Sequence, residues 1–394
     1  MRNLVLLGFY VGGRYFEKYS HGDSFPQVAA YKLESRLLEG LRAAGVRVST
    51  VASIAVSTYP KNRRIWFPAS ILDNGEGRVF PLINLPLFKM GIRFLGSLYG
   101  LMLMGRGMDG VLVYAAHSPN LLAAFIYSKI FRKPYYVYIP DLPAHMGMGL
   151  KSGWLRRGLK RLDAFLLDRL LCASSGLLVI SRPMVEDNPV WRHKPYMVLE
   201  GIAESAPLAR PNGAPVSGGI FYAGGVNRAY GIVELVEGFL QSGVDCDLVI
   251  CGRGDLEGYL DEMSTRHASI KYLGFVPPAR VAELQAQAAV LVLTRDPAQL
   301  YTRYSFPSKL LEYVASGIPV LTTRLKGIPE EYFEYVNAIE GFSSGVVADA
   351  LVKFFSEGQE DLLSRAERGR VWALEAKSGR AIGKRLVEFM GKFK

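Results

Sequence analysis

Short apolar runs alternate with longer stretches of mixed polarity along the first half of the chain. The apolar runs are rich in valine, leucine, isoleucine and tyrosine, and they have the length of buried strands. We expect strands at residues 4–7, 46–54, 110–114, 135–139 and 176–180, and a helix near residues 24–44. Strands that alternate with helices in this way predict an α/β domain built on a parallel sheet.

The second half of the chain repeats this rhythm. We expect strands at residues 219–222, 247–251, 270–273, 290–293 and 319–323, each followed by a helix. A chain of 394 residues is too long for one core, so we predict two Rossmann-like parallel-sheet domains, 1–205 and 206–379, facing each other across a cleft. Residues 204–218 have linker composition, and a helix at 380–394 is expected to cross back onto the first domain.

Residues 301–323 combine a loop, a helix and a buried strand around one carboxylate, Glu312. We expect Ser308 to cap a helix over 309–316 and Gly317 to end it in the left-handed conformation. The free amides of that helix start and the ammonium of Lys309 favour an anion, and Glu312 is placed to accept hydrogen bonds from sugar hydroxyls. The alternative is a plain capped helix with Lys309 and Glu312 solvated on its outer face.

The excess of positive over negative charge lies entirely in the first half of the chain. Residues 1–200 contain 26 Lys and Arg against 13 Asp and Glu, whereas residues 201–394 contain 21 and 23. Such a field suits phosphates or an anionic membrane. Nucleic acid is not expected as a partner, because the chain has no recognition-helix, zinc-finger or RNP-type signature.

The remaining composition favours a cytoplasmic protein without a structural metal. The three cysteines have no metal-like spacing and are expected to be free thiols in a reducing compartment. The first residues run directly into a strand and lack the features of a secretory signal. The longest apolar stretch elsewhere, residues 94–104, is too short to span a bilayer.

One segment of the first half has the pattern of a basic amphipathic helix. Residues 151–171 interleave six lysines and arginines with tryptophan, leucine and phenylalanine. Such a helix can lie in an anionic membrane interface, or it can be an ordinary domain helix whose leucines enter the core. Residues 85–104, with Lys89 and Arg93, are a second candidate for the same membrane surface.

Four loops of the second half follow four predicted strands in an order that resembles retaining glycosyltransferases of family 4, which have the GT-B fold. The loops lie within residues 222–231, 251–255, 272–276 and 301–323. This resemblance covers the whole chain and is most specific in its second half. The relatives in question build bacterial exopolysaccharide and lipid-linked glycans.

The resemblance implies a donor site in the second domain. Gly224, Gly225 and Arg228 would grip the nucleotide diphosphate, and Glu312 would hold the ribose. Phe275 and Val276 would lie against the nucleobase. The alternative is that this segment only turns the chain, with Phe275 in the core. The family commonly has two glutamates separated by seven residues, and Tyr304 stands in place of the first. We therefore expect the donor sugar to be handled by the residues around this position, which are Tyr304, Ser305, Phe306, Ser308 and Lys309.

In the first half the resemblance points to three strand ends. Gly12 and Gly13 correspond to a flexible loop that faces the donor phosphates and the acceptor. His117 occupies the place of a histidine that contacts the donor sugar near the anomeric carbon. Asp141 follows the next strand and is the candidate for facing the acceptor hydroxyl, with a turn cap as the alternative.

These features together predict a retaining glycosyltransferase that moves a sugar from a nucleotide-diphosphate sugar to a saccharide, expected to be lipid-linked, at the inner face of the plasma membrane. We assign catalytic roles to His117, Arg228 and Lys309, and expect no cofactor and no essential metal because protein cations neutralise the leaving group. The alternatives are a catalytically silent partner that binds a nucleotide sugar and a sugar-nucleotide 2-epimerase. A dinucleotide-dependent oxidoreductase is disfavoured, since no Gly-x-Gly-x-x-Gly follows the first strand.

Overall fold

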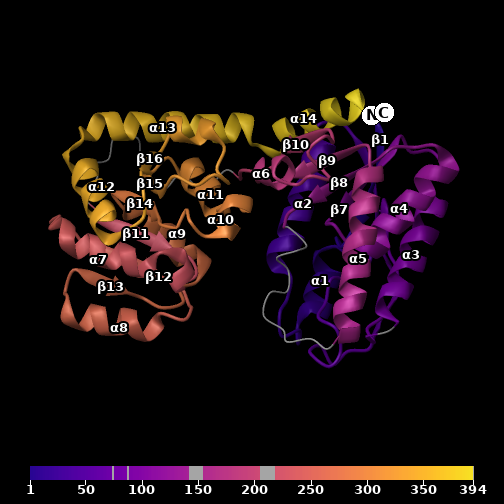
Figure 1. Ribbon diagram of the computed structural model, residues 1–394, viewed down its shortest axis with the longest axis horizontal. Helices are drawn as coiled ribbons and strands as arrows, with labels where there is room; N and C mark the ends of the chain where they lie inside the picture. Colours follow the sequence, from indigo (N-terminus) through magenta and orange to yellow (C-terminus); the bar gives the residue numbers. More distant parts are fainter. Residues whose placement is uncertain (73–74, 87, 142–153, 205–217, 394) are drawn as a thin grey trace. The chain divides into compact units, whose positions relative to one another are not determined.

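A computed structural model describes residues 1–72, 75–86, 88–141, 154–204 and 218–393, and for residues 154–157 it describes the backbone only. The chain forms two compact units (Figure 1). The first comprises Met1–Ile202 together with Gly379–Lys394, and the second comprises Ala203–Ser378. The predicted linker at 204–218 lies almost entirely outside the described residues.

The first unit is built on a sheet with the strand order β10-β9-β8-β7-β1-β2-β5-β4, in which all neighbours except β4 and β5 are parallel. A separate antiparallel pair, β3 and β6, lies beside it. The strands are β1 (Asn3–Gly8), β2 (Arg47–Ala52), β3 (Trp66–Phe67), β4 (Ser70–Ile71), β5 (Gly77–Val79), β6 (Leu82–Ile83), β7 (Gly110–Tyr114), β8 (Tyr135–Ile139), β9 (Gly176–Val179) and β10 (Tyr196–Val198). The central strands β1, β7 and β8 are buried almost throughout, as their apolar runs predict.

The described helices of the first unit are α1 (Gly13–Ser20), α2 (Val28–Ala43), α3 (Lys89–Met104), α4 (Ser118–Phe131), α5 (Trp154–Ala173), α6 (Pro183–Glu186) and α14 (Gly379–Lys392). Helices α3, α4 and α5 lie side by side (Figure 1). The C-terminal α14 packs on α2, where Gly40 and Gly383 approach so closely that a Cβ on Gly383 would lie 2.2 Å from the Gly40 carbonyl oxygen. Tyr136 of β8 donates a hydrogen bond to the Met390 carbonyl at 2.6 Å, which fixes α14 to the sheet.

The second unit is built on a parallel sheet with the strand order β13-β12-β11-β14-β15-β16. These strands are β11 (Ile220–Ala223), β12 (Leu248–Cys251), β13 (Ile270–Tyr272), β14 (Val290–Leu293), β15 (Val320–Thr323) and β16 (Asn337–Ile339). Because every strand is parallel, all of their carboxyl ends meet at one edge of the sheet. The predicted strands of this half are found within one or two residues of their expected limits.

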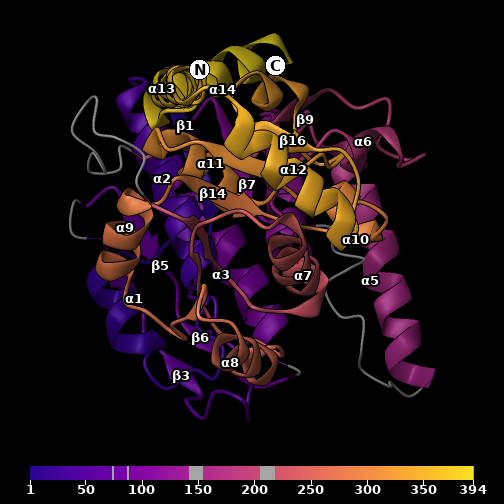
Figure 2. The ribbon, with the colours of Figure 1, turned by 90° about the vertical axis from the view of Figure 1, so that its left-hand side faces the viewer.

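The helices of the second unit are α7 (Ile232–Ser242), α8 (Glu257–Arg266), α9 (Pro278–Gln287), α10 (Leu300–Tyr304), α11 (Ser308–Ser316), α12 (Ser344–Ser356) and α13 (Gln359–Ala376), with 3₁₀ turns η2 (Arg228–Tyr230) and η3 (Glu330–Glu334). Helices α7 and α12 lie side by side in both ribbon views (Figure 2). Since α11 lies between β14 and β15 in the chain and the two strands are parallel, its N-terminus lies at the carboxyl edge of the sheet.

Candidate functional site

Three glycine-containing loops meet at the carboxyl edge of the second sheet. The Gly224 amide donates to the Cys251 carbonyl at 3.0 Å, and the Gly252 amide donates to the Gly274 carbonyl at 2.7 Å. These bonds continue the ladder of β11, β12 and β13 beyond the ends of the strands. The result is a continuous backbone shelf assembled from segments up to 50 residues apart, counted from Gly224 to Gly274.

Only glycine fits at Gly252. Its φ is +145°, and a Cβ there would lie 1.7 Å from the Gly224 carbonyl oxygen. Gly225 is also tightly packed, since a Cβ would lie 2.9 Å from the Tyr230 ring. The glycines of this edge therefore have a packing role that is independent of any ligand.

Arg228 is placed by two reciprocal hydrogen bonds between neighbouring loops. The Arg228 amide donates to the Asp255 carboxylate at 3.0 Å, and the Asp255 amide donates to the Asn227 side-chain oxygen at 3.1 Å. The guanidinium of Arg228 is exposed at the start of η2. Its backbone is thus held in place while its five donors remain directed to solvent, an arrangement that suits a phosphate.

Helix α11 brings its N-terminus to the same edge. Tyr313 of this helix accepts a hydrogen bond from the Ala223 amide at 3.1 Å, so α11 is anchored directly beneath the end of β11. The capping prediction for Ser308 is wrong, because the N-cap residue is Pro307 and no side chain caps the helix. The first-turn amides therefore have no side-chain partner, and the positive end of the helix dipole is available to an anion.

Lys309 and Glu312 form an ion pair on α11, with Nζ and Oε2 separated by 2.9 Å. The side chains are 40% and 52% exposed, so both charges are accessible to solvent. An exposed pair of this spacing stabilises a helix only slightly. A ligand that bears a phosphate and vicinal hydroxyls can therefore replace this pair with contacts to each group at little cost.

Two side chains just before α11 are turned away from solvent. Tyr304 ends α10, and the Oγ of Ser305 is buried without a hydrogen-bond partner among the described residues. Phe306 is buried against the Tyr332 ring, with the ring centroids 5.2 Å apart. The Phe306 side chain is therefore part of the core, and a ligand would meet only its backbone.

Two aromatic rings on this edge each make a cation–π contact with an arginine. Phe275 is 63% exposed, and the Arg253 guanidinium lies 5.2 Å from its ring centroid. The interpretation of Phe275 as a core residue is thus wrong, whereas Val276 beside it is half-buried. Arg295 stacks in a similar way on Tyr230 at 4.7 Å. An exposed ring next to a cation is a suitable platform for a nucleobase.

In the first unit, a buried carboxylate supports the chain that leaves β1. Glu34 of α2 accepts hydrogen bonds from the Phe9 amide at 2.9 and 3.0 Å, and it is 1% exposed. Burial raises the pKa of Glu34 to about 8, against the opposing effect of the backbone hydrogen bonds. The segment ends at Gly12, whose φ of +78° starts α1, so Gly12 and Gly13 lead into a helix instead of the expected flexible loop.

His117 lies between β7 and α4 and is wedged between an arginine and an aromatic ring. Its Nε2 is 3.4 Å from a terminal nitrogen of Arg93, and the Phe9 ring meets it edge-on with centroids 5.4 Å apart. Burial and then the charges of Arg93 and Lys89 hold the pKa of His117 well below its usual value, so it is neutral at pH 7. Because arginine can only donate, Nε2 is the acceptor and Nδ1 carries the proton. Nδ1 is buried and has no partner among the described residues.

Lys89 and Arg93 point into the first unit, and their expected place on a membrane-facing surface is wrong. Lys89 donates to the Val56 carbonyl and, at 3.1 Å, to Thr58, while Arg93 donates to Ser53 at 2.8 Å and to the Ile54 carbonyl at 2.6 Å. Burial lowers the pKa of Lys89 to about 8 and that of Arg93 to about 10. These two cations of α3 hold the segment after β2 and surround His117.

Asp141 follows β8, the strand next to β7, so it shares the carboxyl edge of the first sheet with His117. Its side chain is exposed, and partial desolvation by neighbouring protein atoms raises the pKa of its carboxyl. Tyr114 and Tyr138, at the ends of β7 and β8, pack together with ring centroids 5.7 Å apart. This ring contact joins the ends of the two strands that His117 and Asp141 follow.

Comparison with known proteins decides the family. Residues 219–355 match the family model described as glycosyl transferases group 1. This match covers most of the second unit and includes every loop of the shelf. By this match the second unit is a group 1, family 4-like glycosyltransferase domain.

Solved structures show that this glycosyltransferase has the GT-B fold. It is similar to sucrose-phosphate synthase from Thermosynechococcus elongatus (TM-score 0.63, 15% identity, covering 100% of this chain and 99% of that one). It is also similar to Anabaena Alr3699/HepE in complex with UDP (0.62, 14%, 100% and 100%) and to the lipopolysaccharide outer core galactosyltransferase WaaB (0.61, 12%, 99% and 99%). No curated protein matches its sequence.

The predicted donor-site residues of the glycosyltransferase belong to one edge of the second sheet. Gly224, Gly225 and Arg228 lie in the loop after β11, Phe275 and Val276 follow β13, and Lys309 and Glu312 lie on α11 beside them. Sequence reasoning missed Asp255, Glu34 and Arg93 as positioning residues. The only signal for Asp255 was its place after the Gly-Arg-Gly of the second loop, and nothing local marks Glu34 or Arg93.

Among the residues that the structure describes, no cluster of three or more His, Cys, Asp or Glu side chains is placed to hold a metal ion. Within the same residues, no helix combines the length and the hydropathy that a membrane span needs.

Proposed function

We propose that this nucleotide-sugar-dependent glycosyltransferase is a retaining enzyme that transfers a hexose to a lipid-linked saccharide, with its donor held at the carboxyl edge of the second sheet. The single observation that supports the donor site most is the convergence there of the glycine shelf, Arg228, the uncapped start of α11 and the exposed Phe275. Each of these features has the chemistry of one part of a nucleoside diphosphate.

In this proposal the diphosphate lies against the shelf amides and the start of α11, where Arg228 and Lys309 neutralise it. The ribose hydroxyls donate to Glu312, and the base stacks on Phe275. The sugar lies next to the backbone of Tyr304 and Ser305. Uracil comes first among the bases to test, since the structure of the similar Alr3699/HepE holds UDP.

Catalysis then rests on stabilising the leaving group. The bond between the anomeric carbon and the β-phosphate oxygen breaks, the acceptor oxygen bonds to the same face of that carbon, and the acceptor proton passes to the departing phosphate. Negative charge grows on the diphosphate during this step, so Arg228, Lys309 and the helix dipole bind the transition state more tightly than the ground state. A metal is not required for this neutralisation. Neutral His117 would donate a hydrogen bond from its Nδ1–H to a sugar hydroxyl and keep its proton.

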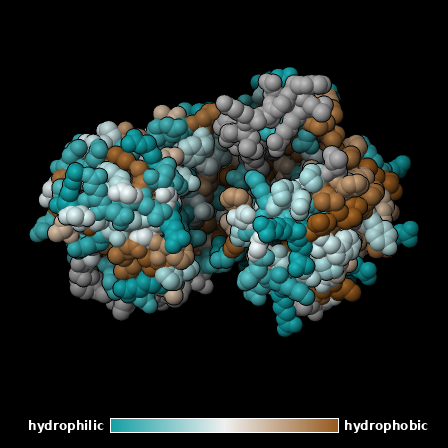
Figure 3. Space-filling model, turned by 90° about the horizontal axis from the view of Figure 1, so that it is seen from below, coloured by the Kyte–Doolittle hydropathy of each residue, from teal (hydrophilic) through white to brown (hydrophobic). Residues whose placement is uncertain are grey.

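The acceptor proposal rests on the first unit, which has exposed apolar side chains among basic ones. On α5, Leu159, Leu162 and Phe165 are 61%, 64% and 58% exposed, and Lys160 and Arg161 are exposed between them. The leucines of this part of α5 are therefore not core residues. Residues 151–153 and the side chains of 154–157 lie outside the described part. Figure 3 shows hydrophobic side chains gathered on one face of the first unit, which is the right-hand unit in that view. This pattern supports peripheral attachment to an anionic membrane.

The donor site is tested by thermal unfolding of the purified chain with UDP, GDP, ADP and CDP, each with magnesium or with a chelator. A ligand that binds only the folded state stabilises it by about 2.7 kcal/mol at 100 times its Kd, which raises Tm by a few degrees. We expect one diphosphate to raise Tm in both conditions, and Glu312→Ala to remove the shift.

Glu283→Ala is the matched control, because Glu283 forms an exposed i,i+3 pair with Arg280 on α9 that resembles the Lys309–Glu312 pair. It should retain the full shift. An unchanged Tm with all four diphosphates would refute the proposed donor site. A shift that requires magnesium would refute metal independence. Binding without transfer from any nucleotide sugar to membrane extracts would favour a silent, donor-binding partner.

A further inference from the structure

Helix α3 places its charged side chains toward the protein interior and its apolar side chains toward solvent, the opposite of an ordinary surface helix. Its two charged residues, Lys89 and Arg93, are 7% and 5% exposed and point into the first unit. Its outward side is apolar and uncharged. The exposed residues there, including Phe88 at the N-cap, are Phe88, Met90, Leu95, Tyr99 and Leu103, with exposed fractions from 43% to 60%. A continuous exposed apolar surface of this kind marks a binding surface.

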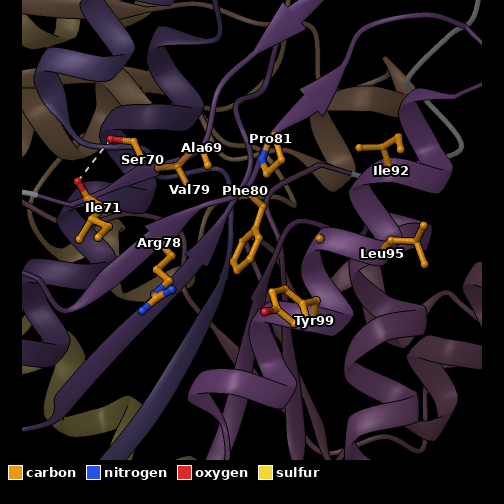
Figure 4. Close-up of a pocket in the computed structure, with 11 residues that line it drawn as sticks. Ala69, Ser70, Ile71, Arg78, Val79, Phe80, Pro81, Ile92, Leu95 and Tyr99 are labelled. Atoms are coloured by element: carbon orange, nitrogen blue, oxygen red, sulfur yellow. Dashed lines mark hydrogen bonds between the residues drawn. The ribbon is translucent and has the colours of Figure 1, made fainter.

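A groove of about 750 Å³ lies along this outward side, between α3 and the β4–β5 edge of the first sheet. Figure 4 shows Phe80 and Tyr99 in its middle, with Ile71 toward one end and Leu95 toward the other. The Phe80 and Tyr99 rings meet edge to face with centroids 6.1 Å apart. A Cβ on Gly96 would lie 3.0 Å from the Phe80 Cβ, so the glycine makes room for this ring against the helix.

The chemistry of the groove favours a hydrocarbon chain with an anionic head. Among the described residues that line it, Arg78 is the only charged one and none is a carboxylate. Arg78 is exposed on β5, where it extends beside Ile71 (Figure 4). At the far end of α3, exposed Arg106, Lys129 and Arg132 border the exposed Ile130. Basic residues around an apolar surface complement the phosphates and chains of an anionic lipid, and they suit a protein partner of mixed charge less well.

We infer that this groove binds the hydrocarbon chain of the phosphate-bearing lipid that carries the acceptor saccharide, with Arg78 facing the lipid phosphate. The inference rests on the proposed lipid-linked acceptor and gives that lipid a place in the first unit. The outward side of α3 then lies in the membrane interface, and the hydrocarbon chain of the lipid passes there from the bilayer into the groove. The inward cations of α3 leave that side free of charge.

The probe for the test is dodecyl phosphate with a diazirine at the end of its chain, used below its micelle concentration on the full-length protein. After irradiation, mass spectrometry should find the label in peptides that contain residues 69–81 and 92–99. Unlabelled dodecyl phosphate should compete, and inorganic phosphate should not. Ala69→Trp, at an exposed lining residue, fills the groove and should abolish most of the labelling. Arg78→Gln should weaken labelling severalfold, and should leave a dodecanol probe unaffected.

Val352→Trp on α12 and Arg47→Gln at the start of β2 are the matched controls, since both positions are exposed and lie outside the groove. Labelling that is spread over the surface, or that is equal in Ala69→Trp and wild type, would overturn the inference. So would a dimer in light scattering that Ala69→Trp dissociates, because the groove would then hold a second copy of the chain. The nucleotide-induced Tm shift is measured on the same variants. It tests the proposed donor site independently, so a failure of the groove inference can be told from a failure of the donor-site proposal.

Discussion

Glu34 is a buried carboxyl whose charge opposes folding, and replacing it with glutamine should therefore stabilise the protein at high pH. Glutamine has nearly the same shape, and its amide oxygen can accept the Phe9 N–H that Glu34 accepts at 2.9 Å. It has no proton to lose. Glu34→Gln therefore removes the titration while it keeps the support of the segment after β1.

The magnitude follows from the pKa of Glu34, which is about 8 in the folded protein against 4.5 for an ordinary glutamate. Because the folded-state pKa is raised, the full stability is present below pH 4.5 and is lost progressively as the pH rises to 8. At about 1.36 kcal/mol per pH unit, the loss is about 3 kcal/mol by pH 7 and about 5 kcal/mol above pH 8. Glu34→Gln should be close to wild type at pH 5 and more stable by this order at pH 8.5.

The assay is urea unfolding at several pH values, followed by hydrogen exchange of the peptide 3–12 so that the first unit is observed on its own. Exchange rates are corrected for the intrinsic effect of pH. Glu39→Gln is the control, since Glu39 is an exposed glutamate on the same helix. If wild type and Glu34→Gln lose stability in parallel between pH 5 and 8.5, then Glu34 does not titrate in this range and the reasoning is refuted.

Three further predictions concern the second unit. Gly252→Ala should destabilise the fold by about 2–3 kcal/mol or more in urea unfolding, because the new Cβ would lie 1.7 Å from a backbone oxygen. Gly243→Ala is the control: Gly243 is also left-handed but has open space around it, so this change should cost only about 1 kcal/mol. Equal costs for the two variants would contradict the packing argument. Phe275→Ala should weaken nucleoside diphosphate binding in calorimetry by about 1–3 kcal/mol if a base stacks on the ring, and Leu273→Ala, also exposed, should not; unchanged affinity would remove Phe275 from the base site. Arg228→Gln should weaken binding and reduce its salt dependence, and an unchanged salt dependence would argue against a phosphate contact.

The long apolar strands could be predicted from the sequence because their pattern is local and strong. The predicted runs at 110–114, 135–139 and 290–293 coincide with β7, β8 and β14. The short strands β3 to β6, two or three residues each, were missed. An element of that length has no measurable periodicity, and pairing with neighbours stabilises it more than its own sequence does. Helix α1 was missed because glycine at its start and the lack of a capping side chain give no helix signal.

Helix α3 was misread for a different physical reason. Charged residues on an amphipathic segment are normally assigned to the solvent side, since burying a charge is costly. Here the carbonyl groups of Val56 and Ile54 and the hydroxyls of Thr58 and Ser53 accept hydrogen bonds from the two cations and offset that cost. These acceptors lie more than 30 residues away in the chain, so the pattern within the helix contains no sign of the reversal.

The candidate residues of the first unit and those of the second unit differ in how far a sequence reveals them, because the two groups are built from different parts of the chain. The donor shelf of the second unit is backbone, and its turns have glycine at fixed places after the strands, so the resemblance to a known family could be recognised from these loops. The site in the first unit is made of side chains that support each other over long separations. Glu34 reaches the Phe9 amide, and Arg93 reaches His117, and neither pair has a fixed spacing. His117 could be named from its place at a strand end, but its tautomer depends on Arg93, and only the folded chain brings those two residues together.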